Sequence, residues 1–148
     1  MNYLKQLKIV HLAMIISTGF LIIISAFFIW QGVVIGNIDK DAEEILEYLV
    51  PALAFILPFT AITYFYYKTK DIRENLDNTA EKKEKYRSVS VFKMTMLEAA
   101  SMFAIVAFLL SGNIMFFILS LVVFLLMLLQ MPADYKVIRD INVRIEDL

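Results

Sequence analysis

Four long apolar stretches, separated by polar segments, make up most of this chain. Each stretch is long enough to cross the hydrocarbon core of a bilayer as a helix, which takes about 20 residues. A helix of a soluble domain would instead carry polar residues along one face of every turn. The pattern therefore predicts four transmembrane helices, at about residues 9–34, 48–67, 91–110 and 114–131.

The connections between these helices predict two antiparallel helical hairpins. Ser111-Gly112-Asn113 is a tight-turn signal, so the third and fourth helices should pack side by side. Residues 68–90 are polar but helix-favouring, and they predict a helical extension between helices 2 and 3 that stands in water. The tail at 132–148 predicts a short helix on the membrane surface or against this extension, with an extended ending as the alternative. The apolar residues that share one helical side of the tail are Val137, Ile138, Ile141, Ile145 and Leu148.

Basic residues lie almost entirely on one side of the predicted membrane. Of the 14 Lys and Arg residues, 13 fall in the N-terminal segment, in the stretch from Lys68 to Lys93 or in the tail, and only Lys40 lies in the first connection, beside five acidic residues. Segments rich in Lys and Arg stay in the cytoplasm. We therefore expect an all-α polytopic protein of the cell's inner membrane, a single membrane domain over residues 1–148, whose N- and C-termini are cytoplasmic.

Composition narrows the classes of function. The chain has no cysteine and one His, without the paired spacing of metal ligands, so no metal site is predicted. It lacks glycine-rich phosphate-binding motifs and a visible nucleophile–base set, and its net charge of −1 without a basic stripe gives nucleic acid no electrostatic attraction. We expect no catalytic residue and no cofactor. The expected partners are the lipid bilayer and a homo-oligomer or another membrane protein.

Glu98 is the main candidate for a functional residue. It lies within the third predicted helix, and no further charged residue follows until Asp134. A carboxylate near the centre of a span costs on the order of 2.5–3.5 kcal/mol, so such groups commonly have a partner or a role. Thr95 and Ser101, three residues to either side, are candidate hydrogen-bond partners. Glu98 is thus an inter-helix contact, a group that handles protons or cations, or an interfacial residue with no role.

Other residues predict contacts between helices. His11, near the start of the first helix, is expected in the same leaflet as Glu98, where it either pairs with that carboxylate or lies at headgroup level. Pro58 predicts a bend in the second helix. Small residues spaced four apart allow helices to approach closely in a membrane. The residues expected at such contacts are Ala13, Ser17 and Gly19 in the first helix and Ala100, Ala104 and Ala107 in the third.

The segment YRSVSVFKMTMLEAASMFAIVAFLL, from Tyr86 to Leu110, resembles the carboxylate helix of subunit c in the rotor ring of F- and V-type ATPases. Arg87 precedes Glu98 by about three turns, and a run of aromatic and aliphatic residues follows. The resemblance implies that Glu98 carries an ion. The whole chain also resembles small four-span membrane proteins of Bacteroidota-type genomes, which implies a fold and no activity. KIVHL at 8–12 is similar to KMTML at 93–97. This similarity is explained either by duplication of a two-helix unit or by the apolar composition that membrane helices share.

These patterns support two functional hypotheses. The first is a non-catalytic integral membrane protein that acts through helix association, as a scaffold or an accessory subunit. The second is a proton or cation conductor that uses Glu98.

Overall fold

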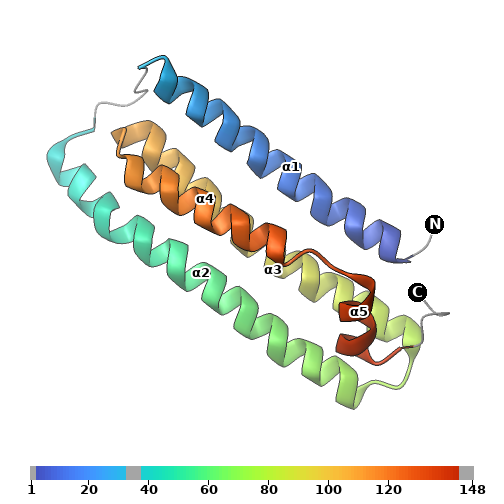
Figure 1. Cartoon of the computed structure of the whole chain (residues 1–148). Coiled ribbons are helices and arrows are strands. Elements are labelled where there is room, and N and C mark those ends of the chain that lie inside the picture. Colours follow the sequence, from blue (N-terminus) through green and yellow to red (C-terminus); the bar gives the residue numbers. More distant parts are fainter. Residues whose placement is uncertain (1–2, 33–37, 144–148) are drawn as a thin grey trace.

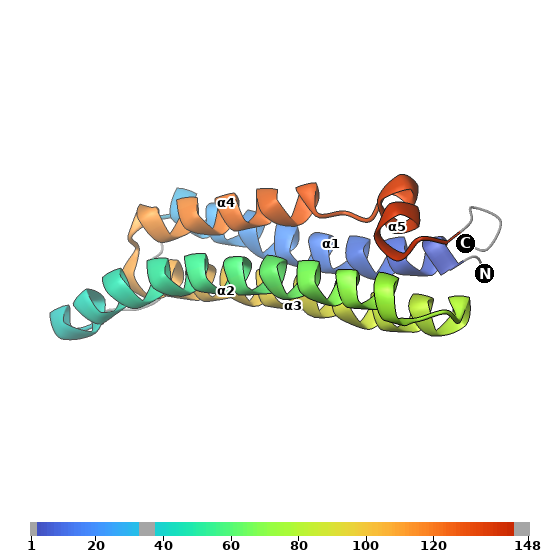
Figure 2. The same ribbon diagram turned by 90° about the horizontal axis from the view of Figure 1, so that it is seen from below.

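The computed structural model describes residues 3–32 and 38–143, which form five α-helices and no strand. In chain order they are α1 (Tyr3–Trp30), α2 (Lys40–Asn75), α3 (Thr79–Ser111), α4 (Ile114–Leu129) and α5 (Asp134–Ile141). The first four run side by side along one axis, and α5 lies at the end of the bundle where both termini are found (Figure 1). We call this the terminal end. Seen from below, α1 and α4 form one layer and α2 and α3 form the other (Figure 2).

Three of the helices, α1, α2 and α3, are each long and apolar enough to cross a membrane. The fourth, α4, is apolar apart from Ser120 but has 16 residues, which extend about 24 Å. It reaches the length of a span only together with α5, from which a bend of 74° separates it. The protein therefore has three to four helices compatible with a multi-pass membrane protein. The predicted end of the first span, at residue 34, lies outside the described residues.

Beyond their apolar parts, α2 and α3 continue as the helical extension that the sequence predicts. α2 ends at Asn75 and α3 begins at Thr79. Asn78 is the N-cap of α3, because its side-chain oxygen accepts a hydrogen bond of 2.9 Å from the backbone amide of Ala80. α2 runs unbroken through both of its prolines, so the bend at Pro58 stays a prediction.

The turn between α3 and α4 is also as predicted. Gly112 has a φ of 72°, and its backbone amide donates to the carbonyl of Phe108 at 2.7 Å. This left-handed conformation favours glycine because it has no Cβ. The side chain of Asn113 then caps α4 by accepting from the backbone amide of Met115 at 3.1 Å. The chain therefore reverses within two residues, and α3 and α4 are antiparallel neighbours.

A fixed register joins α1 to α3. Hydrogen bonds between the two helices include, in order along both helices, Tyr3–Lys83, His11–Ser90 and Ser17–Glu98. The bonded residues are separated by 80, 79 and 81 positions in the sequence. Because the numbers of both partners increase together, α1 and α3 are parallel, and each α1 residue on this face meets the α3 residue about 80 positions later. This register determines which polar side chains can meet.

Helix α5 packs against the other helices, which was one of the two predicted positions for the tail. Its Val137 and Ile141 are completely buried. They belong to an apolar cluster with residues of three other helices, among them Leu7, Ile72 and Tyr86. The tail residues Ile145 and Leu148 lie outside the described residues. The terminal end is thus a packed region with contributions from α1, α2, α3 and α5.

Candidate functional site

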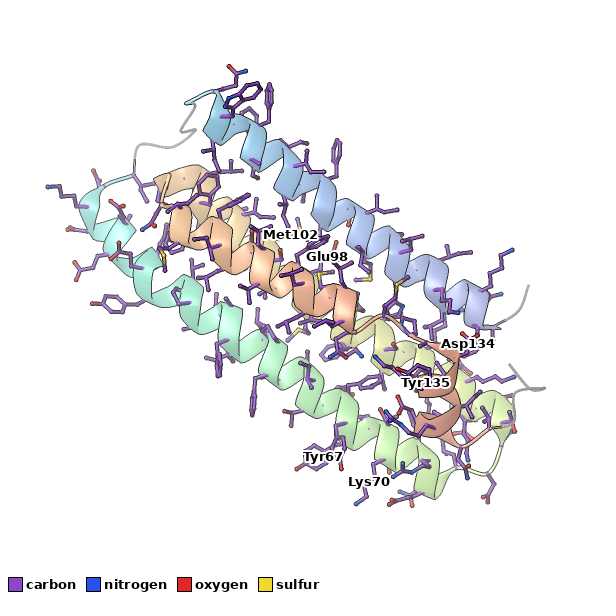
Figure 3. All side chains as sticks on the ribbon, in the orientation of Figure 1. Tyr67, Lys70, Glu98, Met102, Asp134 and Tyr135 are labelled. Atoms are coloured by element: carbon purple, nitrogen blue, oxygen red, sulfur yellow. The ribbon has the colours of Figure 1, made fainter. Side chains whose placement is uncertain are left out.

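Glu98 lies on the face of α3 that meets α1 (Figure 3). One of its carboxyl oxygens is 2.8 Å from the hydroxyl oxygen of Ser17. That hydroxyl is also 2.9 Å from the carbonyl oxygen of Met14. A serine hydroxyl has a single proton to donate. The Ser17 hydroxyl can donate to an ionised Glu98. Alternatively it donates to the carbonyl of Met14, and a protonated Glu98 then donates to Ser17. The geometry therefore accommodates both the ionised and the protonated acid.

The Ser17–Glu98 pair is at the surface of the bundle rather than in its core. Ser17 is exposed and Glu98 is half-buried. The residues around them are apolar and exposed: Ile16 is 61% exposed, Phe20 is 62% exposed and Met102, one turn beyond Glu98, is 41% exposed. Such a surface suits lipid tails, so the carboxylate interrupts an otherwise apolar face.

His11 does not pair with Glu98, and that prediction is wrong. Its Nδ1 is 2.9 Å from the carbonyl oxygen of Leu7, and its Nε2 is 3.1 Å from the hydroxyl of Ser90. The register between α1 and α3 explains this, because Ser90 faces His11 while Glu98 lies eight residues further along α3, about 12 Å away. His11 is also completely buried between the helices, and its depth relative to the headgroups stays a prediction. A neutral imidazole that donates to the carbonyl of Leu7 and accepts from the hydroxyl of Ser90 gives both ring nitrogens of His11 a hydrogen-bond partner.

Thr95 and Ser101 do not bond to Glu98 either. The hydroxyl of Thr95 is exposed and donates to the carbonyl of Val91, one turn earlier, at 3.1 Å. The hydroxyl of Ser101 is buried and donates across to the carbonyl of Ser120 in α4 at 3.3 Å. The two hydroxyls therefore have other acceptors, because one turns back on its own helix and the other faces α4 while Glu98 faces α1.

The small residues of α3 lie between helices. Ala100, Ala104 and Ala107 are all buried, with at most 2% of each residue exposed. In α1, Gly19 meets α4 closely, because a Cβ at that position would lie 3.3 Å from the ring of Phe124. The bundle therefore uses these small residues for close approach.

Ala13 is not in such a contact, because it is exposed. The buried side of α1 includes His11 and Ile15. Ala13 is two residues from each of them, about 200° around the helix. The expectation that Ala13 packs within the bundle is therefore wrong. Together with the exposed Ser17, one turn on, it forms a small-residue face that points away from the core of the bundle.

Lys93 is a polar residue whose position the sequence did not reveal. A lysine near the end of a span ordinarily extends toward water. Lys93 instead turns inward and is 4% exposed. Its Nζ donates to the side-chain oxygen of Gln130 at 3.0 Å and lies 3.7 Å from the centre of the Phe65 ring. The available signal was Gln130 itself, an uncharged polar residue at the same end of an adjacent helix.

Tyr86 places a second polar group beside Lys93, because both line the same pocket. Its hydroxyl donates to a carboxyl oxygen of Asp140 in α5 at 3.3 Å. Burial raises the pKa of Tyr86 well above its ordinary value, and the neighbouring Asp140 carboxylate adds to this. The phenol therefore remains a neutral donor at physiological pH, and it connects α3 to α5.

Neither a metal site among the described residues nor a match to a known protein family assigns a role to Glu98, Lys93 or their partners. In the part of the chain that the structure describes, no three His, Asp or Glu side chains come together as a metal site would require. Comparison with known proteins found no match to this chain among protein-family models, curated proteins or solved structures.

Proposed function

We propose that this chain is a non-catalytic integral membrane protein that acts by associating with a further transmembrane helix, from a second copy of the chain or from another membrane protein. The observation that supports this is the Ser17–Glu98 pair on an apolar surface, in which Ser17 is exposed and Glu98 is half-buried. A carboxylate that faces lipid is costly, and a helix that covers it removes the lipid contact and adds hydrogen bonds. A pair sealed inside the bundle would need no such partner.

The surface around the pair is suited to close helix contact. Ala13 and Ser17 are both small and exposed, one turn apart on α1, and Ser17 bonds directly to Glu98. Small residues allow two helix backbones to approach, and polar residues then bond across the contact. The same face of α1 and α3 thus provides both features of a transmembrane association surface.

We further propose that α4 is a fourth span and that both termini, the α2–α3 extension and α5 are cytoplasmic. The distribution of Lys and Arg supports this orientation, since Lys40 alone lies at the opposite end of the bundle. The extension and α5 would then serve as the docking surface of a scaffold or an accessory subunit of the inner membrane.

Replacing Ala13 with tryptophan should disrupt the association without disturbing the fold. The bulky ring would occupy an exposed position and would hold a partner helix away from Glu98. In native gels of mildly solubilised membranes, we expect wild-type protein in a complex larger than its 17.1 kDa monomer and the Ala13→Trp variant in a smaller form. Ala52→Trp, at an exposed alanine of α2, is the matched control and should behave as wild type. A monomeric wild type, or equal behaviour of the two variants, would contradict the proposal.

A proton or cation conductor is the second candidate. It is favoured by the geometry at Ser17, which suits both an ionised and a protonated Glu98. In proteoliposomes, the wild-type chain should then carry an ion flux that Glu98→Gln abolishes while its circular dichroism spectrum is unchanged. Absence of flux from the folded wild type would exclude this candidate and would leave the association proposal unaffected.

A further inference from the structure

A polar pocket of about 250 Å³ lies at the terminal end, between α2, α3, the end of α4 and α5. Among the described residues that line it, Lys93, Lys136 and Arg139 are cationic and Asp140 alone is anionic. The polar pocket therefore has an excess of positive charge. It also shares no residue with the Ser17–Glu98 pair, so an inference from it is independent of the proposed function.

Lys93 is the buried charge of this polar pocket. Its protein neighbours, the neutral amide of Gln130 and the ring of Phe65, stabilise the ammonium group but do not neutralise it. None of the ion pairs recorded for residues 3–32 and 38–143 includes Lys93. The carboxylate of Asp140 in the same polar pocket favours the charged form of Lys93, but only from beyond ion-pair distance. A buried charge without a counterion in contact is costly. An anion bound in the polar pocket would supply that counterion.

Asp140 is held by other groups of the polar pocket. One of its oxygens accepts from Tyr86 at 3.3 Å, and the other lies 3.6 Å from Nε of Arg139. The two remaining cations come from the same side of α5, three residues apart. Lys136 donates to the carbonyl of Leu129 at the end of α4 at 3.3 Å, and the side chain of Arg139 is 71% exposed. Both cations thus lie at the edge of the polar pocket, where they can contact a phosphate.

An apolar groove of about 530 Å³ continues from the polar pocket between α2 and α4. All of its lining residues are apolar, and Phe55, Phe59 and Val122 are at least half exposed. Ile62 lines both the apolar groove and the polar pocket, so the two are adjacent. Along α2 the groove extends from Pro51 to Ile62, about 16 Å.

We propose that the polar pocket and the apolar groove together bind one anionic phospholipid, with its phosphate beside Lys93 and an acyl chain between α2 and α4. A soluble phosphate would use the polar pocket alone, whereas a phospholipid matches both parts and their order along the helix axis. Basic pockets between transmembrane helices on the cytoplasmic side of a membrane are suited to anionic headgroups.

The test is native mass spectrometry of the full chain from mixed micelles that contain equal amounts of phosphatidylglycerol and phosphatidylcholine. We expect the wild type to retain one phosphatidylglycerol in preference to phosphatidylcholine. Lys93→Gln should weaken this retention by about tenfold or more, as the loss of a charge-assisted hydrogen bond predicts. Lys70→Gln, at an exposed lysine of α2 that points away from the bundle (Figure 3), should leave it unchanged. Equal retention of the two lipids by the wild type would overturn the proposal.

Two further variants keep the test decisive if Lys93→Gln fails to fold. Arg139→Gln removes an exposed cation from the edge of the polar pocket and should weaken retention of phosphatidylglycerol about threefold to tenfold. Val122→Trp fills the apolar groove and should also weaken retention of phosphatidylglycerol, yet leave any binding of inorganic phosphate, measured by calorimetry, unchanged. Unchanged lipid retention in both variants would overturn the proposal, and phosphate binding with no effect of Val122→Trp on the lipid would assign the polar pocket to a soluble phosphate instead.

Discussion

Replacing Phe116 with alanine should lower the free energy of unfolding by about 3 kcal/mol, the lower end of the range for buried Phe→Ala changes. Phe116 is 1% exposed and is the more deeply buried of the two phenylalanines in the buried core of the apolar cluster at the end of the bundle opposite to the terminal end. The other buried members of this cluster come from two other helices: Val50 from α2, and Ala104, Ala107 and Phe108 from α3. Removal of the Phe116 ring leaves a cavity between helices, and the side chains around it lose their dispersion contacts.

The lower end of the range applies because lipid is itself apolar. Transfer of an apolar side chain from lipid to the bundle gains little, so packing provides most of the stabilisation. Phe103→Ala is the matched control, because Phe103 is 51% exposed on α3, and it should change the free energy of unfolding by less than about 1 kcal/mol. The measurement is unfolding in mixed micelles of increasing sodium dodecyl sulfate, followed by circular dichroism. Equal losses in the two variants would show that Phe116 is not packed between helices.

Cysteine labelling should give an all-or-none result for the proposed topology. The chain has no cysteine, so every single-cysteine variant has one reactive site. Lys40 and Glu84 are both exposed. α2 begins at Lys40, and this start lies at the end of the bundle opposite to the terminal end (Figure 1). α3 begins at the terminal end and carries Glu84 five residues after its start at Thr79. On intact cells, a maleimide that does not cross membranes should label Lys40→Cys fully and should label Glu84→Cys only after permeabilisation. Labelling of both variants from the same side would contradict the orientation.

The same experiment distinguishes three spans from four. Tyr135 is 65% exposed and follows α4 at the start of α5 (Figure 3). If α4 crosses the membrane, Tyr135→Cys should be labelled from the same side as Glu84→Cys. Asn113→Cys, in the turn before α4, should be labelled from the same side as Lys40→Cys. Labelling of Tyr135→Cys together with Lys40→Cys would leave α4 as a helix that does not span.

Features that depend on local sequence were predictable. A run of apolar residues determines where a long helix can lie, and a glycine followed by asparagine determines a tight turn, as at Gly112 and Asn113. Asn78 likewise caps α3 through an atom of its own side chain. The position of α5 was predictable only as one of two alternatives, because an amphipathic helix can bury its apolar side against lipid or against protein.

The partners of the polar residues depended on the tertiary structure. By itself, the sequence established that this protein consists of long apolar helices with a few polar groups within them, Glu98 and His11 included. It contained no information on how far α1 slides along α3 or how each helix is rotated. The observed register places His11 opposite Ser90 and Glu98 opposite Ser17, and the rotation of α3 turns Lys93 inward to Gln130. Register and rotation result from the packing of all the helices together, and a shift of two turns would give every polar group a different partner.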